Sequence, residues 1–157
     1  MKPELIKNRD HIKVSFEKIE KFENTYNLKL ETKYKKFLLD ENGGSISGYY
    51  IFCHDKNDNL NFIQTVELYT LERLEEVHNI TLTNKDYKYK NYYLFLKKKM
   101  LTIGYSNLAF SLCICYSKKD FGKLYYINDV HDYKFIFFAN NIDDFINGFE
   151  LCPEELL

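Results

Sequence analysis

The sequence predicts an α+β domain with a mixed or mostly antiparallel sheet of about six strands, flanked by helices. Two observations support this prediction. Apolar residues recur at helical spacing near both ends of the chain, and residues 101–139 alternate short β-branched and aromatic runs with short polar breaks. Breaks of this length favour consecutive antiparallel pairing, because a parallel pair needs a long crossover. We expect a single domain over residues 1–157.

Two helices are expected at the start of the chain. The first carries an apolar stripe at spacings of three and four residues, formed by Ile12, Phe16, Ile19, Phe22 and Tyr26. Ser15 can cap its N-terminus, and Asn27 can adopt the left-handed conformation that ends it. The second helix begins near Thr32 and ends at Asn42-Gly43-Gly44, since glycine takes a positive φ without steric cost.

The pattern then changes to that of strands. Gly48–Phe52 and Phe62–Tyr69 are rich in β-branched and aromatic residues and flank a polar turn, which predicts a hairpin. Thr70 can cap a third helix, whose apolar positions are Leu71, Leu74 and Val77. Residues 79–99 are polar and rich in Lys and Tyr, and we expect a long loop and an edge strand there.

Four further strands and a last helix are expected in the C-terminal part. The strands are Leu101–Tyr105, Leu112–Tyr116, Lys123–Asn128 and Lys134–Ala139. The helix begins near Asn141, whose side chain can cap it with Asp144 three residues on, and its stripe is Phe145, Ile146 and Phe149. The expected order is therefore α-α-β-β-α-β-β-β-β-α.

Charge and targeting features limit the classes of partner. The net charge of −1 argues against bulk attraction to nucleic acid or to an anionic membrane. Residues 84–99 hold six Lys and one Asp, a local +5, whereas residues 120–157 hold five Asp and three Glu against two Lys, a local −6. Because the sequence has no signal peptide and no apolar span, we expect a cytoplasmic protein with reduced thiols and no membrane association.

Motifs for catalysis, cofactors or metals are absent from the sequence. It has no phosphate-binding loop, no dinucleotide fingerprint and no His-Glu-x-x-His, so we expect neither a catalytic residue nor a cofactor, and no enzyme activity. Its cysteines lack the paired Cys-x-x-Cys spacing of structural zinc sites, and no metal is expected. Cys113 and Cys115 lie two apart on a predicted strand, so both should face the same side and pack in the core.

Several motifs, in order, resemble the Smi1/Knr4 (SUKH) family. That family opens with Ile-x-x-x-Glu, then Leu-Pro-x-x-Tyr-x-x-Phe-Leu and an Asn-Gly-Gly turn, which read here as Ile19…Glu23, Leu30–Leu38 and Asn42-Gly43-Gly44. Its later strand and helix motifs are similar to Thr102-Ile103-Gly104, Gly122–Tyr126 and Ala139–Ile146. The chain departs from the family at two positions, where Glu31 replaces a usual Pro and Ile127 a common Trp.

This resemblance spans about residues 12–150, which implies that the core of the domain lies there. It also implies a SUKH-like fold and a function in protein binding. Many bacterial members look like immunity proteins, which neutralise a co-encoded polymorphic toxin by binding it. The resemblance therefore implies an immunity protein that binds and occludes a cognate toxin, with a nuclease as one candidate class. Eukaryotic members resemble regulatory or scaffolding proteins, so an interaction domain of that kind is the alternative.

The acidic C-terminal third is the segment that we connect with partner binding, because a negative surface speeds association with a basic nuclease. Asp129, His131 and Asp132 lie in a turn without an evident structural duty. Tyr49, Tyr50 and Tyr126 are candidate aromatic anchors, although one of two consecutive tyrosines on a strand should point into the core. Asp143 and Asp144 are expected instead to stabilise the N-terminus of the last helix.

A nucleic-acid-binding function is a more distant alternative, centred on Lys85–Lys99. This stretch interleaves Lys with Tyr and Phe, the residue types that bind single strands. No basic domain surrounds it, however, and nucleic acid is not an expected partner. We expect a solvated segment with Tyr92, Leu94 and Leu96 alternating into the sheet.

Overall fold

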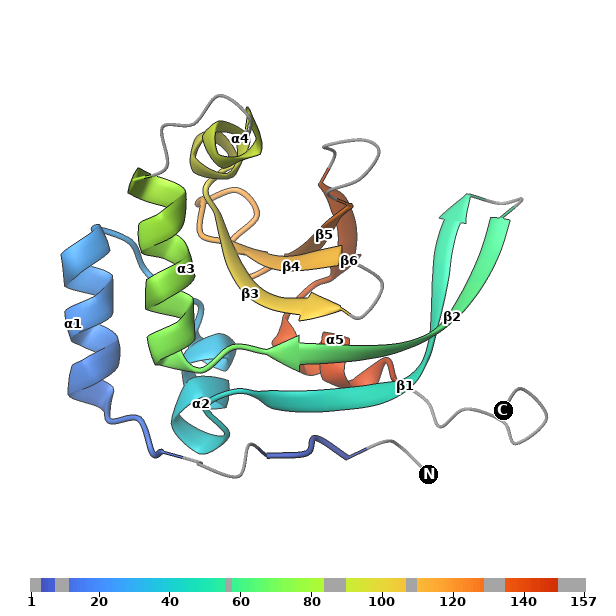
Figure 1. The fold of residues 1–157 in the computed structure, drawn as a ribbon, viewed down its shortest axis with the longest axis horizontal. Helices are drawn as coiled ribbons and strands as arrows, with labels where there is room; N and C mark the ends of the chain where they lie inside the picture. The colour runs from blue at the N-terminus through green and yellow to red at the C-terminus, as the bar shows by residue number, and fades with distance from the viewer. Residues whose placement is uncertain are drawn as a thin grey trace.

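The computed structural model describes residues 4–7, 12–55, 58–83, 90–106, 110–128 and 135–149. Its centre is one six-stranded sheet in the order β1-β2-β3-β4-β5-β6, in which every neighbouring pair is antiparallel (Figure 1). The strands are β1 (Gly44–Asp55), β2 (Asp58–Leu68), β3 (Met100–Ser106), β4 (Phe110–Cys115), β5 (Leu124–Asn128) and β6 (Ile136–Ala139). The predicted α+β class, with a mostly antiparallel sheet of about six strands, is confirmed.

Five helices occur in the part of the chain that the structure describes. They are α1 (Phe16–Tyr26), α2 (Thr32–Asp40), α3 (Leu71–Thr83), α4 (Lys90–Lys98) and α5 (Ile142–Asn147). In Figure 1, α1 and α3 lie against each other at one end of the sheet. The hydroxyl of Tyr26 on α1 donates to Asn79 Oδ1 on α3 at 2.8 Å, which joins the two helices.

The first helix has the predicted caps but a shorter buried stripe. The Ser15 side chain accepts from Lys18 N at 3.3 Å, and Asn27 has φ 49°, as the sequence predicted. Ile19 and Phe22 are buried, whereas Ile12 and Phe16 are 59% and 51% exposed. Those two residues were wrongly included in the stripe, because α1 begins only at Phe16 and its first turn lies beyond the core.

The connection from α2 into β1 is fixed by Asn42. This residue has φ 46°, and its side chain is buried. Its amide nitrogen donates to the carbonyl of Ile12 at 2.8 Å, and its amide oxygen accepts from the backbone N–H of Leu71 at 2.9 Å. One side chain thus joins the segment before α1 to the start of α3, and the predicted Asn-Gly-Gly turn acts as a tertiary link.

The prediction of a loop and an edge strand over residues 79–99 was wrong. Helix α3 continues to Thr83, and residues 90–98 form α4, so the expected element order lacked one helix. Within α3, His78 and Thr81 extend the buried side that Leu71 and Leu74 begin. The alternation of Tyr92, Leu94 and Leu96 suggested a strand because short apolar runs fit both helical and strand periods.

The main core lies between the sheet and the helices α1, α2, α3 and α5. It includes Ile19, Leu38, Leu74, Leu101 and Phe145, all at or near zero exposure. A smaller second cluster occupies the other side of the sheet, where Phe95 of α4 packs with Met100, Cys113, Cys115 and Ile127. Cys113 and Cys115 are both buried on this side of the sheet, as expected from their spacing.

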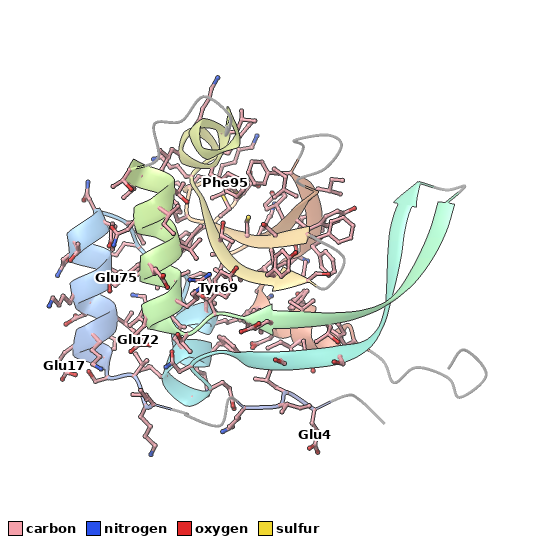
Figure 2. All side chains as sticks on the ribbon, in the orientation of Figure 1. Glu4, Glu17, Tyr69, Glu72, Glu75 and Phe95 are labelled. Atoms are coloured by element: carbon pink, nitrogen blue, oxygen red, sulfur yellow. The ribbon has the colours of Figure 1, made fainter. Side chains whose placement is uncertain are left out.

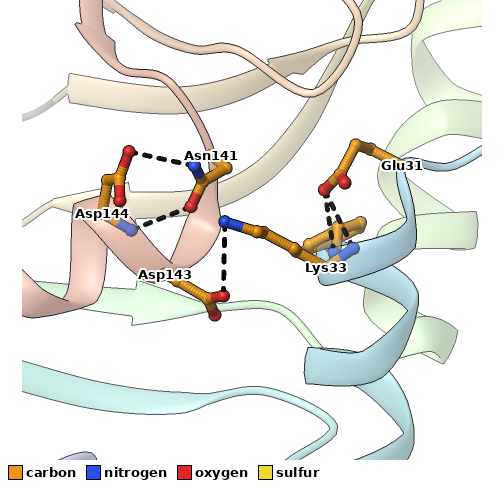
Figure 3. Close-up of polar contacts among 6 residues, drawn as sticks. Glu31, Lys33, Asn141, Asp143 and Asp144 are labelled. Atoms are coloured by element: carbon orange, nitrogen blue, oxygen red, sulfur yellow. Dashed lines mark hydrogen bonds and ion pairs between the residues drawn. The ribbon is translucent and has the colours of Figure 1, made fainter.

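The last helix is capped as the sequence predicted (Figure 3). Asn141 Oδ1 accepts from Asp144 N at 3.0 Å, while Asn141 Nδ2 donates to Asp144 Oδ2 at 2.9 Å. Asp143 lies in the same first turn and approaches Lys33 Nζ of α2 at 3.9 Å. Both aspartates therefore serve the helix N-terminus, which confirms their expected structural role.

Candidate partner-binding face

The side of the sheet opposite the main core is covered only in part. Helix α4 lies over one region of it, where Phe95 points from the helix towards the sheet (Figure 2). The ring of Phe95 meets that of Phe135 edge-on, with centroids 5.0 Å apart. Beyond this cluster, aromatic side chains on the same side of the sheet are exposed.

Strand register places these exposed rings on one surface. Tyr105 of β3 pairs with Glu67 of β2 and with Ser111 of β4, and Tyr125 of β5 pairs with Phe137 of β6. We define the open face as these five residues. Tyr105 and Phe137 are 44% and 50% exposed. The face therefore combines aromatic rings with hydroxyl groups, the residue types that supply contact area at low entropic cost in binding surfaces.

The rings of Tyr125 and Phe137 support each other. Their centroids lie 5.9 Å apart with planes at 78°, an edge-to-face arrangement that favours a fixed geometry. Partial burial raises the pKa of the Tyr125 hydroxyl, and the nearby Asp120 carboxylate raises it further. The hydroxyl therefore stays protonated at neutral pH and is available as a hydrogen-bond donor at the open face.

A long hairpin extends beside this face. Strand β2 pairs with β3 only at Val66, Glu67 and Leu68, whereas its pairing with β1 continues out to Asp55 and Asp58. We call residues 47–55 and 58–65 the hairpin arm. In Figure 1 the arm bends away from the body of the sheet. Within the arm, the described residues of β1 and β2 pair only with each other.

The sequence matches the model of one protein family. The model of the SMI1 / KNR4 family (SUKH-1) matches residues 13–148, most of the chain. The chain belongs to this family. No curated protein matches it. The SUKH resemblance read from the sequence is thus correct.

The residues that carry the SUKH motifs are largely structural. Glu23 is almost fully buried and accepts from Leu30 N at 2.8 Å, from Lys35 Nζ at 2.7 Å and from Lys29 Nζ at 3.3 Å. Burial alone would raise the pKa of this carboxyl, but the hydrogen bonds from Lys35, Leu30 and Lys29 outweigh it and lower the pKa. This SUKH glutamate fixes the link between α1 and α2.

The predicted site residues lie in different places. Tyr49 and Tyr50 belong to the hairpin arm, where the register pairs them with Ile63 and Phe62. Tyr126 is only 7% exposed and packs against Phe110 and Phe138 on the core side of β5. Of the consecutive pair, it is therefore Tyr126 that points inwards. Its ring is not part of the open face.

The acidic candidates Asp129, His131 and Asp132 lie outside the described residues. Sequence reasoning missed Tyr105 and Phe137, the two most exposed rings of the open face. Their strands were predicted, but simple alternation from the buried Leu101 and Ile103 would have turned Tyr105 towards the core. Two irregularities in strand register, one between Thr102 and Gly104 and one between Leu124 and Tyr125, decide which side of the sheet the rings face.

The described residues also limit what other chemistry the surface displays. Within them, no three His, Cys, Asp or Glu side chains gather at a distance that could hold a metal ion. Burial lowers the pKa of His78, which packs between α1 and α3 against the ring of Tyr26. None of the helices described is long and apolar enough to cross a bilayer.

Proposed function

We propose that this chain is an immunity protein that neutralises a cognate polymorphic toxin by direct binding. The open face is the observation that carries the proposal: two aromatic rings of a rigid sheet, Tyr105 and Phe137, are about half exposed. Membership of the SUKH family, many of whose bacterial members look like immunity proteins, supports the same function. Neutralisation is by occlusion, with the bound protein covering the toxin's active site or substrate channel.

The physics of interfaces supports this use of the open face. Large aromatic side chains in the centre of an interface carry much of its binding energy, and tyrosine is enriched among them. Because the strands hold Tyr105, Tyr125 and Phe137, their backbone does not have to be ordered on binding. An interface of ordinary size buries about 1,600 Å² in total, so it extends beyond these three rings.

The hairpin arm and the acidic segment extend the proposed interface. Tyr49 and Tyr50 lie on the arm, next to the open face in the sheet order. Asp129, His131 and Asp132 follow β5, whose Tyr125 belongs to that face. Negative charge there favours a basic partner such as a nuclease, since opposite charges speed diffusional encounter. We place the complex in the cytoplasm of the producing cell, and propose no catalytic activity.

Co-expression with the toxin tests the proposal. The toxin's C-terminal domain, taken from the gene that neighbours this one, is expressed in cells with and without the immunity chain. We expect rescue of growth and a stable complex on size-exclusion chromatography. A failure to rescue, together with recovery of a different stable partner in a pull-down, would contradict neutralisation and favour a regulatory or scaffolding function.

A further inference from the structure

A cleft lined by none of the open-face residues lies where three segments that are distant in the sequence meet. The segment after α1 contributes Asn27 and Lys29, the turn before β3 contributes Lys99, and the connection between β4 and β5 contributes Lys118. The aromatic rings of Tyr116 and Phe121 line it as well. Its volume is about 620 Å³, within the usual range for small-molecule sites. We call this feature the basic cleft.

Positive charge dominates the basic cleft. Glu23 is its acidic lining residue among those described, and this carboxylate already binds Lys35 at 2.7 Å as well as Lys29 at 3.3 Å. No carboxylate in the described part of the chain lies within ion-pairing distance of Lys99 or Lys118. With three lysines against one glutamate, the lining carries a net charge of +2, in a protein whose overall charge is −1.

The uncharged lining groups narrow the choice of ligand. Phe121 is 42% exposed although it is a large apolar ring, and Tyr116, which also lines the cleft, is half-buried. Aromatic rings at the edge of a cationic site provide stacking surfaces for flat rings. The side chain of Asn27 is exposed and brings an amide, which can both donate and accept hydrogen bonds. Ammonium, aromatic and amide groups thus occur together in one small space.

We propose that the basic cleft binds a phosphorylated ring compound of the nucleotide class. Lys29, Lys99 and Lys118 face the phosphate, Phe121 stacks with the base and Asn27 meets polar atoms of the base or sugar. An acidic peptide would also satisfy the lysines. It fits less well, because it provides no flat ring for Phe121 and needs a longer groove than a cleft of about 620 Å³. The proposal is independent of toxin neutralisation.

Binding of simple nucleotides to the whole chain tests the site. AMP and GMP are titrated by isothermal calorimetry in low salt, with adenosine and inorganic phosphate as partial ligands. We expect each nucleotide to bind at least about tenfold more tightly than either partial ligand, since both phosphate and ring contribute. Binding should weaken on raising the salt from about 50 to about 200 mM, because lysine–phosphate contacts are screened.

Two double variants separate the site from general surface charge. Lys99→Asn combined with Lys118→Gln removes two charges from the cleft, and Asn tolerates the left-handed backbone of Lys99, where φ is 54°. Lys13→Gln combined with Lys21→Gln removes two exposed charges elsewhere. We expect about tenfold or more loss of nucleotide affinity in the first pair and less than twofold in the second. Lys118→Gln alone, at an exposed loop position, gives a second measurement should the first pair unfold.

Several results would overturn the proposal. The first is that no mononucleotide and no 5′-phosphorylated tetranucleotide shows detectable binding at about 2 mM. The second is that both double variants lose the same nucleotide affinity. The third is that a hexaglutamate peptide binds more tightly than the nucleotides. Comparison of AMP with the tetranucleotide identifies the source of the ligand. Tighter binding of the tetranucleotide would show that the site takes the 5′ end of a nucleic-acid strand. Equal or weaker binding of the tetranucleotide would show that the site takes a free nucleotide.

Discussion

Gly122 lies directly against the side chain of Glu31, so that a Cβ atom on Gly122 would come within 2.4 Å of Glu31 Cγ. Glu31 is the N-cap of α2, where its carboxylate accepts from Lys33 N at 3.0 Å and from Tyr34 N at 3.3 Å (Figure 3). The connection between β4 and β5 therefore leaves room for the helix cap. Gly122 also has φ 83°, a left-handed value that favours glycine.

Gly122→Ala should destabilise the protein by about 2 kcal/mol. About half of this comes from the left-handed backbone and about half from displacement of the Glu31 cap. The free energy of unfolding in urea measures the loss. Combining the change with Glu31→Ala closes a double-mutant cycle, in which we expect less than the sum of the two single effects. Strict additivity would show that the cap and the glycine are not coupled.

Asn42→Ala should cost more than Asn42→Gly. Both changes remove the hydrogen bonds to Ile12 and Leu71, for which we expect a loss of about 2 kcal/mol. Alanine adds roughly 1 kcal/mol, because φ at this position is 46° and glycine adopts that value freely. Unfolding in urea ranks the three proteins. Equal stability of the two variants would show that the backbone conformation contributes little.

Local rules made the starts of α1, α3 and α5 predictable from the sequence. A cap depends on two or three neighbouring residues, so Ser15, Thr70 and Asn141 could be recognised without any tertiary information. Helix α4 could not be recognised in this way. Its buried residue Phe95 belongs to a cluster with Met100 and Cys115, but the apolar residues 92–96 form one short run that fits both the helical and the strand period.

The side of the sheet on which the open-face rings lie depends on two irregularities in strand register, which no local sequence pattern reveals. Leu101 and Ile103 face the main core, so simple alternation would also place Tyr105 there. The pairing of β3 with β4 shifts between Thr102 and Gly104, and this bulge turns Tyr105 to the other side. A second shift, next to Tyr125, accompanies the pairing of β5 with β6. Sequence reasoning could find these strands but not the sides of their rings.

Tyr34→Phe should leave the protein equally stable or stabilise it by up to about 1 kcal/mol. The Tyr34 hydroxyl is buried without a hydrogen-bond partner among the described residues, and burial raises its pKa. Removing a buried polar group that has no partner removes its desolvation cost. Thermal unfolding should show an unchanged or slightly raised Tm.

Tyr26→Phe is the matched control for this substitution. The Tyr26 hydroxyl donates to Asn79 Oδ1 at 2.8 Å, so its removal should cost about 1 kcal/mol. Removing the hydroxyl group should therefore lower the free energy of unfolding at Tyr26 but not at Tyr34. A clear loss of stability in Tyr34→Phe would reveal a partner for its hydroxyl.

Glu23→Gln should cost about 2 kcal/mol at pH 7, because it leaves Lys35 and Lys29 without their carboxylate. The folded pKa of Glu23 is lower than its ordinary value of 4.5. A carboxyl with a lowered pKa stabilises the fold above the unfolded pKa, and this contribution is lost as the pH falls through the folded pKa. The difference between wild type and variant should therefore shrink below about pH 4.5.

Urea unfolding at several pH values measures this difference. Glu20→Gln, an exposed change on the same helix, serves as the control and should alter stability by less than about 0.5 kcal/mol throughout. A wild-type–variant difference for Glu23 that stays constant down to pH values below its folded pKa would contradict the proposed stabilisation by its charge.

Tyr105→Ala and Phe137→Ala should each weaken toxin binding by at least about tenfold, since each removes an exposed ring from the proposed interface centre. Because both side chains are about half exposed, neither change should lower the free energy of unfolding by more than about 1 kcal/mol. Phe16→Ala is the matched control, because Phe16 is 51% exposed against 50% for Phe137 and lies on α1, away from the sheet. Affinity measured by calorimetry, with rescue of growth in parallel, separates the three variants. Equal toxin affinity of Phe137→Ala and Phe16→Ala would show that the interface does not include the open face. The rescue of growth would then test neutralisation separately.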